Sequence, residues 1–429
     1  MQVRFSQEMD NRAVTERELD TRHQDAYRVS AVVSVYKSTR FLGGLFEDLL
    51  AQTLYQRGEL EIVVVDSASP ENDWDIIKRY ADNYLHIRAI RTSDRESLYQ
   101  AWNRGIVESR GRYITNANTD DRHHPEALET IANALDQHPD ISLIYSDQYV
   151  SSVFNETFEQ NSRVKLLRPA DYFAPSLLLA YPFGPQPMWR REVHDEIGLF
   201  DGSYKATGDF DFAIRFARKF KAMHLSQPLG LYYVGDSAIS FRDDTMAVEN
   251  GRIVSTWYNR DTILELYRIE GVALTSAEQR AAALLDFGLR ALEFYSSWNY
   301  GKAQRKIHLA LECFQLAAEE APGWVPSLNN AALTIALEGG IDEAVKLLEM
   351  AFGVTREETL RRNVQILQSA RKGNSFVSDI RWMPSGLSLP SEPELFHVDV
   401  PRITAAQQVN PLLQADAAPF THTGRDDRS

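Results

Sequence analysis

The sequence predicts two folded parts of different classes: an α/β domain with a mostly parallel sheet, then an all-helical domain of repeat-like helices. Short runs rich in Val and Ile alternate with segments whose apolar residues recur at helical spacing, which is typical of a parallel sheet covered by helices. Later, apolar positions recur after 34 residues, which is typical of stacked helix pairs. We therefore expect a charged arm (1–28), an α/β domain (29–270), a helical domain (271–372) and a Pro-rich, partly disordered tail (373–429).

Composition narrows the class of protein further. The chain has 429 residues, and 60 Asp and Glu against 46 Lys and Arg give a net charge of −14. Because a phosphate backbone requires a positive surface, we expect no nucleic-acid partner. The single cysteine, Cys313, excludes an internal disulfide and a Cys-rich zinc site. No apolar run is long enough for a membrane span, and residues 1–28 lack the apolar stretch of a signal peptide, so we expect a cytoplasmic protein.

The elements of the α/β domain follow from apolar patterning. The run 29–35 is β-branched, and the segment after it has apolar residues at helical spacing. The run 60–65 is almost continuously apolar, and strands of this kind suit a sheet buried on both faces. The predicted strands are 29–35, 60–65, 86–90, 111–115 and 141–147, and the predicted helices are 41–55, 74–83, 98–109, 125–137 and 209–220.

The helical domain shows a 34-residue register. A small residue, an aromatic four positions later, another small residue and a following proline resemble the second helix of a tetratricopeptide repeat. The pattern of the first helices is poorer, and an ordinary helical bundle remains the alternative. The matched positions are Ala310, Phe314 and Ala317 in one copy, closed by Pro322, and Ala344, Leu348 and Ala351 in the next.

Two groups of polar side chains directly follow predicted strands. Asp66 ends one strand, and Asn118, Thr119, Asp120 and Asp121 follow another. In open α/β sheets, ligands bind at the carboxyl ends of the strands. A carboxylate there accepts a hydrogen bond from a nucleobase imide or a ribose hydroxyl, and adjacent carboxylates suit Mg²⁺ or Mn²⁺. The simpler alternatives are a capped turn at Asp66 and a helix N-cap at the second group.

The order of these motifs resembles the nucleotide-sugar-binding half of family 2 inverting glycosyltransferases, which have the GT-A fold. The family's first strand ends P-x-Y-N, and residues 34–37 read Ser-Val-Tyr-Lys. Its second strand ends V-D-D-G-S, and residues 65–69 read Val-Asp-Ser-Ala-Ser. Its A-R-N-x-G helix appears at 101–105 as Ala-Trp-Asn-Arg-Gly, and its Y-I-x-F-L-D-x-D-D appears at 113–121 as Tyr-Ile-Thr-Asn-Ala-Asn-Thr-Asp-Asp. The resemblance extends over residues 29–240.

The resemblance implies roles for individual residues. Tyr36 and Asp66 would hold the nucleobase, and Asn118 would hold the ribose. Asp120 and Asp121 would bind a divalent cation, Mn²⁺ or Mg²⁺, that offsets the charge of the leaving diphosphate. The full set implied for the nucleotide sugar is Ser34, Val35, Tyr36, Asp66, Asn103, Asn118 and Thr119.

The chain also departs from the family pattern. Asn118 stands in place of the first Asp of D-x-D, and an amide is a weaker metal ligand than a carboxylate. Metal binding would therefore fall on Asp120, with Asp121 as a second ligand or a neighbour of the first. His123 and His124 lack the spacing of helical zinc ligands, and we expect both to be exposed to solvent.

The segments 186–191, 198–201 and 208–212 resemble the family's acceptor side, where an acidic pair begins a helix. Asp209 matches the Asp of that pair, and Gly208 stands in place of the Glu. An inverting displacement needs one base to deprotonate the acceptor, and the resemblance makes Asp209 that base. Further candidates for acceptor or diphosphate contacts are Trp189, Arg190 and Asp211, for which core packing, a solvated charge and a helix-dipole contact are the respective alternatives.

Together these features predict a metal-dependent inverting glycosyltransferase that uses a nucleotide-diphosphate sugar, with a UDP-sugar favoured. The acceptor would be a glycan or a peptide or protein, and the helical repeats would bind the acceptor, a protein partner or a second copy of the chain. One alternative is a catalytically weak scaffold that acts through its helices. A nucleotidyltransferase is disfavoured because residues 38–44 form a poor phosphate loop.

Overall fold

A computed structural model describes residues 26–235, 245–293, 304–370, 379–387 and 389. The chain divides into two compact units, Met1–Tyr258 and Asn259–Ser429. The expected domain boundary after residue 270 falls inside the second unit, because the helix before it groups with the helices that follow. The expected N-terminal arm lies outside the described residues, apart from its last few positions. No helix of the described ranges is long and apolar enough to cross a membrane.

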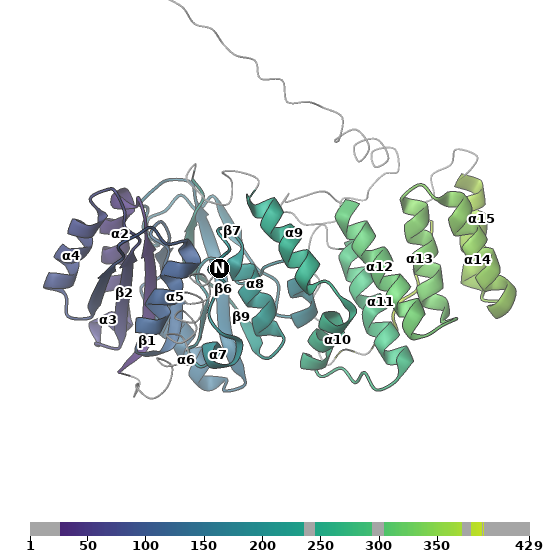
Figure 1. Cartoon of the computed structure of the whole chain (residues 1–429), viewed down its shortest axis with the longest axis horizontal. Helices are drawn as coiled ribbons and strands as arrows, with labels where there is room; N and C mark the ends of the chain where they lie inside the picture. Colours follow the sequence, from purple (N-terminus) through teal and green to yellow (C-terminus); the bar gives the residue numbers. More distant parts are fainter. Residues whose placement is uncertain (1–25, 236–244, 294–303, 371–378, 388, 390–429) are drawn as a thin grey trace, which may run out of the picture. The chain divides into compact units, whose positions relative to one another are not determined.

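The first unit is built on one nine-stranded sheet with the order β3-β2-β1-β4-β8-β6-β9-β5, and β7 pairs with β6 (Figure 1). The four strands at one end of this order are parallel, and β8 joins them antiparallel to β4. This arrangement confirms the expected α/β class. The strands are β1 (Tyr27–Val35), β2 (Leu60–Asp66), β3 (Ile87–Arg91), β4 (Gly111–Asn116), β5 (Arg122–His123), β6 (Ile141–Ser151), β7 (Lys165–Leu167), β8 (Met188–Arg190) and β9 (Lys221–Tyr233).

Helices cover both faces of the parallel half. The apolar stripe of α2 (Thr39–Leu50) packs with α4 (Asp73–Asn83), α6 (Ala127–Gln137) and one face of β1 in a single core. On the other face of β1, α5 (Leu98–Glu108) brings Gly105 against Val32, where an added Cβ would lie 2.4 Å from a Val32 methyl. Figure 1 shows α2 and α4 on one side of β1 and β2, and α5 on the other. The remaining helices of this unit are α3 (Thr53–Gln56), α7 (Val193–Ile197), α8 (Gly208–Ala217), α9 (Thr245–Trp257) and the 3₁₀ turn Ala174–Leu178.

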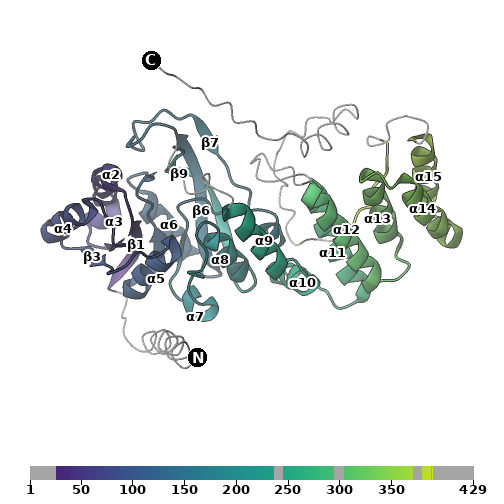
Figure 2. The ribbon, with the colours of Figure 1, turned by 45° about the horizontal axis from the view of Figure 1, so that its top comes forward.

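The other half of the sheet depends on two long strands. β6 and β9 pair in parallel over most of their length, with register shifts near Asp147, and β7 extends the sheet at β6 (Figure 2). Sequence patterning found β6 but not β9. The interior of β9 contains Pro228 and Gly230, two residue types that interrupt a strand pattern and are tolerated here beside the shifted register.

The second unit consists of successive helices that pack against their neighbours along the chain (Figure 1). All six positions of the 34-residue register are buried, three on α12 and three on α14. This is the side on which each helix packs, so the register marks the core of the unit; its assignment to the tetratricopeptide class stays a prediction. The helices are α10 (Arg260–Ile269), α11 (Ala277–Glu293), α12 (Gln304–Glu320), α13 (Val325–Leu337), α14 (Ile341–Thr355) and α15 (Glu358–Ala370).

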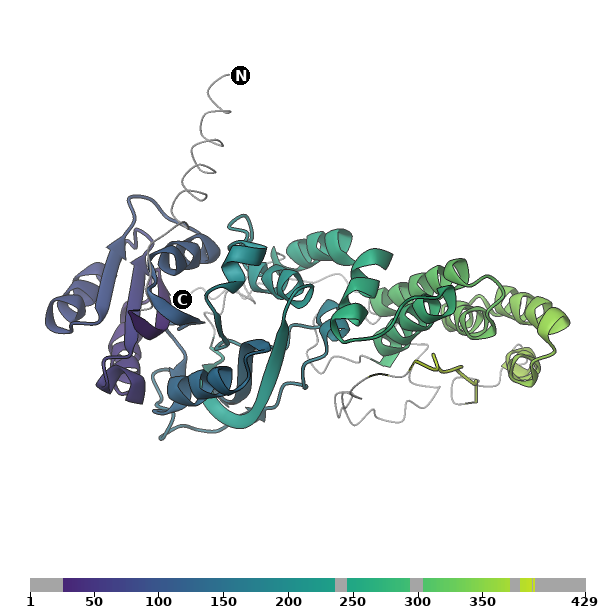
Figure 3. The same ribbon diagram turned by 90° about the horizontal axis from the view of Figure 1, so that it is seen from below.

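One part of the expected tail is packed in the core. The segment 379–387 belongs to no helix or strand, but Ile380 and Met383 lie in the apolar core formed by α13, α14 and α15. Figure 3 shows this yellow segment running along one side of the second unit's helices. The predicted disorder of the remaining tail concerns residues outside the described ranges.

Candidate functional site

The parallel strands end together at one edge of the sheet. Val35 pairs with Asp66, and Asp66 pairs with Arg91, so the ends of β1, β2 and β3 are level. Asp66 is fully buried, and its Oδ1 accepts a hydrogen bond from the Ser69 N–H at 2.9 Å. This bond confirms the turn-capping alternative for one oxygen only. Oδ2 lies 3.2 Å from Arg91 Nε without accepting a hydrogen bond, so it is a buried acceptor that lacks a donor.

Burial raises the pKa of Asp66, and the Ser69 N–H and Arg91 oppose that rise. A buried oxygen without a donor costs free energy until a donor reaches it. The imide N–H of a uracil ring is such a donor. The structure therefore leaves Asp66 suited to the role that the family resemblance implies.

Tyr36 follows β1 at the same edge and is half-buried. The Arg95 guanidinium lies 4.2 Å from the centre of its ring, in a cation–π contact. Arg95 was not singled out in the sequence, because it lies in the polar loop after β3. The guanidinium covers one face of the ring, so a base stacked on that face would require Arg95 to move or to stack on the base in turn.

The loop after β4 holds the acidic group in a defined arrangement. Asn118 Nδ2 donates to Asp121 Oδ2 at 2.9 Å, and the Tyr233 N–H donates to Asp121 Oδ1 at 3.1 Å. Burial and the charge of Asp120 raise the pKa of Asp121 well above its usual value. Since both oxygens of Asp121 already accept hydrogen bonds, its carboxyl positions the loop and is poorly placed to be a second metal ligand. Thr119 donates to Ser38 Oγ at 3.3 Å, which ties this loop to the end of β1.

Arg122 holds the same loop in place through hydrogen bonds to its backbone, and the sequence analysis did not single it out. Its buried guanidinium donates to the backbone oxygens of Thr119 and Asp121 and to Asn155 Oδ1 at 2.7 Å. Gly44 of α2 leaves room for it, because an added Cβ there would lie 2.5 Å from Arg122 Nη2. No sequence signal distinguishes this arginine from an exposed one.

Asp120 is the remaining candidate for a metal ligand. Burial raises the pKa of its carboxyl, and no described residue other than Asp120 itself donates a hydrogen bond to it. Within the described ranges, no three His, Cys, Asp or Glu side chains gather closely enough to hold an ion by themselves. Mg²⁺ is commonly held by one or two carboxylates together with substrate phosphates. A single available carboxylate fits that mode of binding, in which the donor completes the site.

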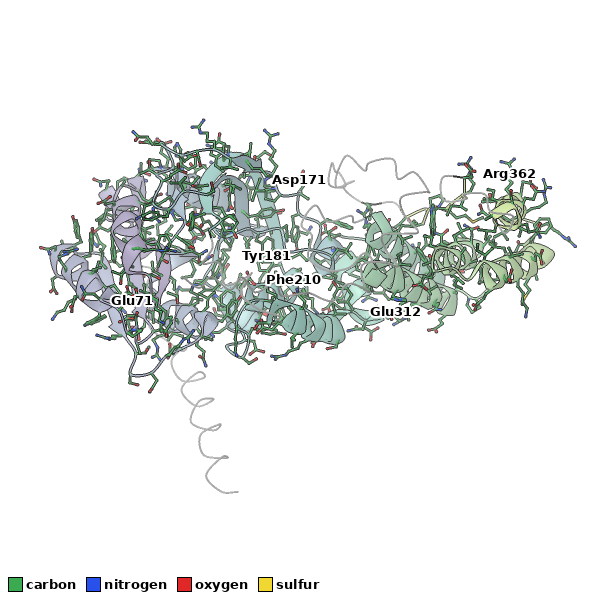
Figure 4. The ribbon with its side chains drawn as sticks, turned by 90° about the horizontal axis from the view of Figure 1, so that it is seen from above. Glu71, Asp171, Tyr181, Phe210, Glu312 and Arg362 are labelled. Carbon is green, nitrogen blue, oxygen red and sulfur yellow. The ribbon has the colours of Figure 1, made fainter. Side chains whose placement is uncertain are left out.

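Asp209 lies in the first turn of α8. Its Oδ1 accepts hydrogen bonds from the Tyr99 hydroxyl at 3.1 Å and from the Phe210 N–H at 2.9 Å, and no other described residue occupies Oδ2. Burial raises the pKa of Asp209 to about 6, against the opposing effect of the Tyr99 hydrogen bond. Tyr181, labelled beside Phe210 in Figure 4, is partly buried, and burial of its hydroxyl together with the Asp209 charge raises its pKa well above the usual value.

Gly208 explains how Tyr99 reaches Asp209. A Cβ at Gly208 would lie 2.7 Å from the Tyr99 ring, so the glycine that replaces the family's Glu makes space for this tyrosine. The backbone segment before Asp209 is held in place by Glu249 of α9, whose carboxylate accepts hydrogen bonds from the N–H groups of residues 205, 206 and 207. Both Tyr99 and Glu249 were missed: Tyr99 fits an ordinary apolar helix position, and Glu249 lies beyond the family resemblance.

Two predicted contact residues are used for packing instead. The amide of Asn103 donates to the Phe200 carbonyl at 2.7 Å and accepts the Phe200 N–H at 2.9 Å, so it holds a loop and is not available to a nucleotide sugar. Trp189 is buried, and its indole N–H donates to His194 Nε2 at 2.9 Å. The core-packing alternative is therefore correct for Trp189.

The two charged residues predicted to contact the acceptor or the diphosphate, Arg190 and Asp211, are also bonded within the fold. Arg190 is buried and donates to the carbonyls of Leu135, His138 and Ile141, so it caps the end of α6 and cannot contact a diphosphate. Its register opposite Tyr113 places it away from the carboxyl end of β4. Asp211 accepts hydrogen bonds from Arg215 and Trp257, which accounts for its carboxylate within the unit.

The expectation for His123 was wrong. Its side chain is buried, and Nδ1 lies 2.7 Å from Asp48 Oδ2. His124 is partly exposed and packs edge-on against Phe158. His123 is the last residue of β5 and His124 follows the strand, so the two adjacent side chains lie in different surroundings.

A mixed sheet whose parallel half ends in carboxylates, with an acidic helix start on the other half, defines the class of GT-A glycosyltransferases. Residues 30–198 match the sequence model described as glycosyl transferase family 2. Residues 30–198 are therefore similar to family 2 glycosyltransferases, as the motifs predicted.

Two curated relatives and one solved structure are similar to parts of this chain. The uncharacterized glycosyltransferase YibD of Escherichia coli is 29% identical over 121 residues, which are 28% of this chain and about a third (34%) of YibD. The uncharacterized glycosyltransferase YwdF of Bacillus subtilis is 28% identical over 213 residues, 49% of this chain and 75% of YwdF. A crystal structure of S. aureus TarS in complex with UDP aligns with 84% of this chain and 98% of its own at 15% identity, with a TM-score of 0.47. Because the chain spans only about a third of YibD, that match identifies a domain and not a whole protein.

Proposed function

We propose that this protein is an inverting, metal-dependent glycosyltransferase that uses a nucleotide-diphosphate sugar, with a UDP-sugar as the favoured donor. The observation that carries the proposal is the state of Asp209: one oxygen accepts hydrogen bonds from two donors, no other described residue donates to the second oxygen, and burial raises the pKa to about 6. A general base works best when its pKa lies near the working pH. The acceptor is a glycan or a peptide or protein.

The donor side of the proposal rests on the strand ends. Asp66 Oδ2 is a buried acceptor without a hydrogen-bond donor, which suits the imide N–H of a base. Tyr36 follows the end of β1 at the same edge of the sheet, and its ring can stack on a base. Asp120 would hold a divalent cation together with the donor's phosphates, and such a cation offsets the negative charge that develops on a leaving diphosphate. Asn118 and Asp121 keep the Asp120 loop in place through their mutual hydrogen bond.

Asp209 supplies the acceptor step. Its open Oδ2 accepts the proton of the acceptor hydroxyl as the acceptor oxygen attacks the anomeric carbon from the face opposite the diphosphate. Tyr99 and the Phe210 N–H hold Oδ1, so the carboxylate keeps one orientation during the attack. One base and one leaving group on opposite faces give inversion at the anomeric carbon.

The proposal is tested with Asp120→Asn, which keeps the side-chain shape and removes its charge. Calorimetric titration of UDP and of UDP-, GDP- and dTDP-sugars with Mn²⁺ should show Mn²⁺-dependent binding to the wild-type chain. In Asp120→Asn, the affinity for the best donor should fall at least about tenfold, or roughly 1.4 kcal/mol, and donor hydrolysis should be lost.

Asp82→Asn is the matched control, because Asp82 is exposed near the C-terminal end of α4 and away from the strand ends. It should leave binding unchanged. If no nucleotide sugar binds or is hydrolysed by the wild-type chain, the transferase proposal fails. If Asp120→Asn binds its donor as the wild type does, the metal role of Asp120 fails. Donor binding without turnover would favour the scaffold alternative.

A further inference from the structure

Helix α9 is attached to the first unit mainly through polar side chains. Of its 13 residues, Glu249 and Ile253 are the buried ones, and Val248 and Val254 are exposed. A surface helix ordinarily buries an apolar stripe, whereas α9 buries one carboxylate beside one isoleucine. Figures 1 and 2 show α9 beside α8, whose first turn contains Asp209. Because a buried carboxylate costs free energy unless donors satisfy it, the partners of Glu249 show what α9 holds in place.

The Glu249 carboxylate accepts four hydrogen bonds from the segment that leads into α8. Its Oε1 accepts the Lys205 N–H at 2.7 Å. Its Oε2 accepts the Ala206 N–H at 2.9 Å, the Thr207 N–H at 3.0 Å and the Thr207 hydroxyl at 3.1 Å. Thr207 is the N-cap residue of α8, and its side chain forms no cap hydrogen bond there. The start of α8 is therefore held by a carboxylate from another helix and not by a local cap.

Two further side chains of α9 hold the two ends of the same segment. The Arg252 guanidinium donates to Asp201 Oδ2 at 2.8 Å and to Ser203 Oγ at 2.7 Å. The Trp257 indole N–H donates to Asp211 Oδ1 at 2.9 Å. Positions 249, 253 and 257 are four apart and lie on one face of the helix, with 252 beside them. One face of α9 thus contacts residues 201–211, the segment that contains the proposed base.

Titratable side chains face Asp209 from three other elements: Tyr99 of α5, Tyr181 of the loop before β8, and Glu249 of α9. On α8 itself, Asp211 already accepts hydrogen bonds from two side chains. Burial raises the pKa of Asp209 to about 6, the charge of Glu249 adds to this rise, and the Tyr99 hydrogen bond opposes it. Glu249 and Tyr99 therefore act on the base in opposite directions.

We propose that Glu249 positions Asp209 for the transfer reaction, by fixing residues 205–207 so that α8 begins where Asp209 can face the acceptor. Glu249 is a positioning residue, since it acts through the backbone of this segment. The family pattern has a Glu directly before this Asp, and Gly208 stands there in this chain. The second carboxylate near the base comes from α9 instead. The inference rests on the proposed function of Asp209 as the base.

The test is Glu249→Gln, which keeps the shape of the side chain and removes its charge. The readout is donor hydrolysis, with water as the acceptor, at saturating nucleotide sugar and Mn²⁺ from about pH 4.5 to 8. The kcat should fall at least about tenfold because the base is misplaced, while the donor KM stays within about twofold. The acidic limb of the profile should move to lower pH, because the charge that raises the Asp209 pKa is gone. Tyr99→Phe should move the same limb to higher pH.

Glu159→Gln is the matched control, because it makes the same change at an exposed position between β6 and β7 and should alter neither kcat nor the limb. A folded Glu249→Gln variant with the wild-type kcat overturns the inference. A lower kcat with an unmoved limb shows a merely structural role and overturns it as well.

If Glu249→Gln does not fold, Glu249→Asp decides. Its charge is kept, but its carboxylate is one methylene short of the three N–H groups, so kcat should fall while the limb stays in place. A wild-type kcat in Glu249→Asp then overturns the inference. A wild-type chain that hydrolyses no nucleotide sugar refutes the proposed function itself, which distinguishes that failure from a failure of Glu249.

Discussion

At the scale of single residues, Asp209 owes its properties to two neighbours, Gly208 and Tyr99, of which Gly208 departs from the family pattern. Gly208 has no side chain, and the Tyr99 ring fills the space beside it. Tyr99 then donates to Asp209 and holds down a pKa that burial raises. The lost Glu of the acidic pair is thus replaced by a neutral donor, which leaves Asp209 with fewer negative neighbours to disturb it.

The first prediction concerns Tyr99→Phe and the pH dependence of transfer. Asp209 must be deprotonated to act as a base, so activity should rise with pH through about 6 in the wild type. The Tyr99 hydrogen bond favours the charged form, so its loss should raise the Asp209 pKa. The acidic limb of the profile of kcat/KM against pH should move to higher pH in Tyr99→Phe, while donor affinity stays close to that of the wild type.

Asp209→Asn serves as the reference for this series. It should abolish transfer at every pH and leave donor binding nearly intact. Because the folded pKa lies above the ordinary value of 3.8, the charged carboxyl destabilises the fold above pH 6, and this cost vanishes at low pH. Asp209→Asn should therefore raise the free energy of unfolding at pH 8 by roughly 1–2 kcal/mol. A pH profile that does not move in Tyr99→Phe would contradict the proposed base.

At the scale of elements, patterning predicted the parallel half of the sheet because its central strands, β1 and β2, are rich in consecutive apolar residues. The five predicted strands correspond to β1, β2, β3, β4 and β6. β8 was missed because three residues carry no periodicity, and β9 was missed because proline and glycine interrupt it. Element-level prediction failed where a strand is stabilised by its neighbours more than by its own sequence.

The same limit applies to the site. The sequence could predict that Asp66 and Asp120 lie near the same edge of the sheet, since parallel strands bring their carboxyl ends to one edge. The roles of Asn103 and Arg190 could not, because both side chains bond to backbone groups that are distant in sequence. A sequence motif specifies only a residue type. The folded structure shows which groups of the protein already form hydrogen bonds with the polar atoms of that residue.

The turn after β2 provides the second prediction at this scale. Ala68 has φ 47°, in the left-handed region, at the position where the family pattern has glycine. This conformation costs a residue with a Cβ about 1–2 kcal/mol, and glycine loses roughly 0.5–1 kcal/mol of entropy in return. Ala68→Gly should thus raise the free energy of unfolding by roughly 0.5–1 kcal/mol, as measured by urea denaturation. Ala81→Gly, within α4, is the control and should lower it; a destabilised Ala68→Gly would refute the strain at this turn.

At the scale of the whole molecule, each unit has a core of its own. The core of α2, α4 and α6 lies within the first unit, and the core of α13 to α15 with Ile380 and Met383 lies within the second.

The net charge of −14 raises a separate question, since the proposed donor is an anion and would have to bind an acidic protein. The proposed cation at Asp120 would meet it locally by offsetting both the Asp120 charge and the diphosphate charge, while Asp121 keeps the loop in place.

Separate cores predict separate responses to ligands. A ligand stabilises the part of the chain whose folded form it binds, by mass action. Saturating UDP with Mn²⁺ should therefore slow hydrogen exchange at residues 111–122 and leave residues 325–370 unchanged, as mass spectrometry of the full chain can resolve. Since Asp120→Asn removes the metal ligand, the slower exchange at residues 111–122 should disappear in that variant. Slower exchange at 325–370 on addition of UDP with Mn²⁺ would show instead that the donor site and the helices are coupled.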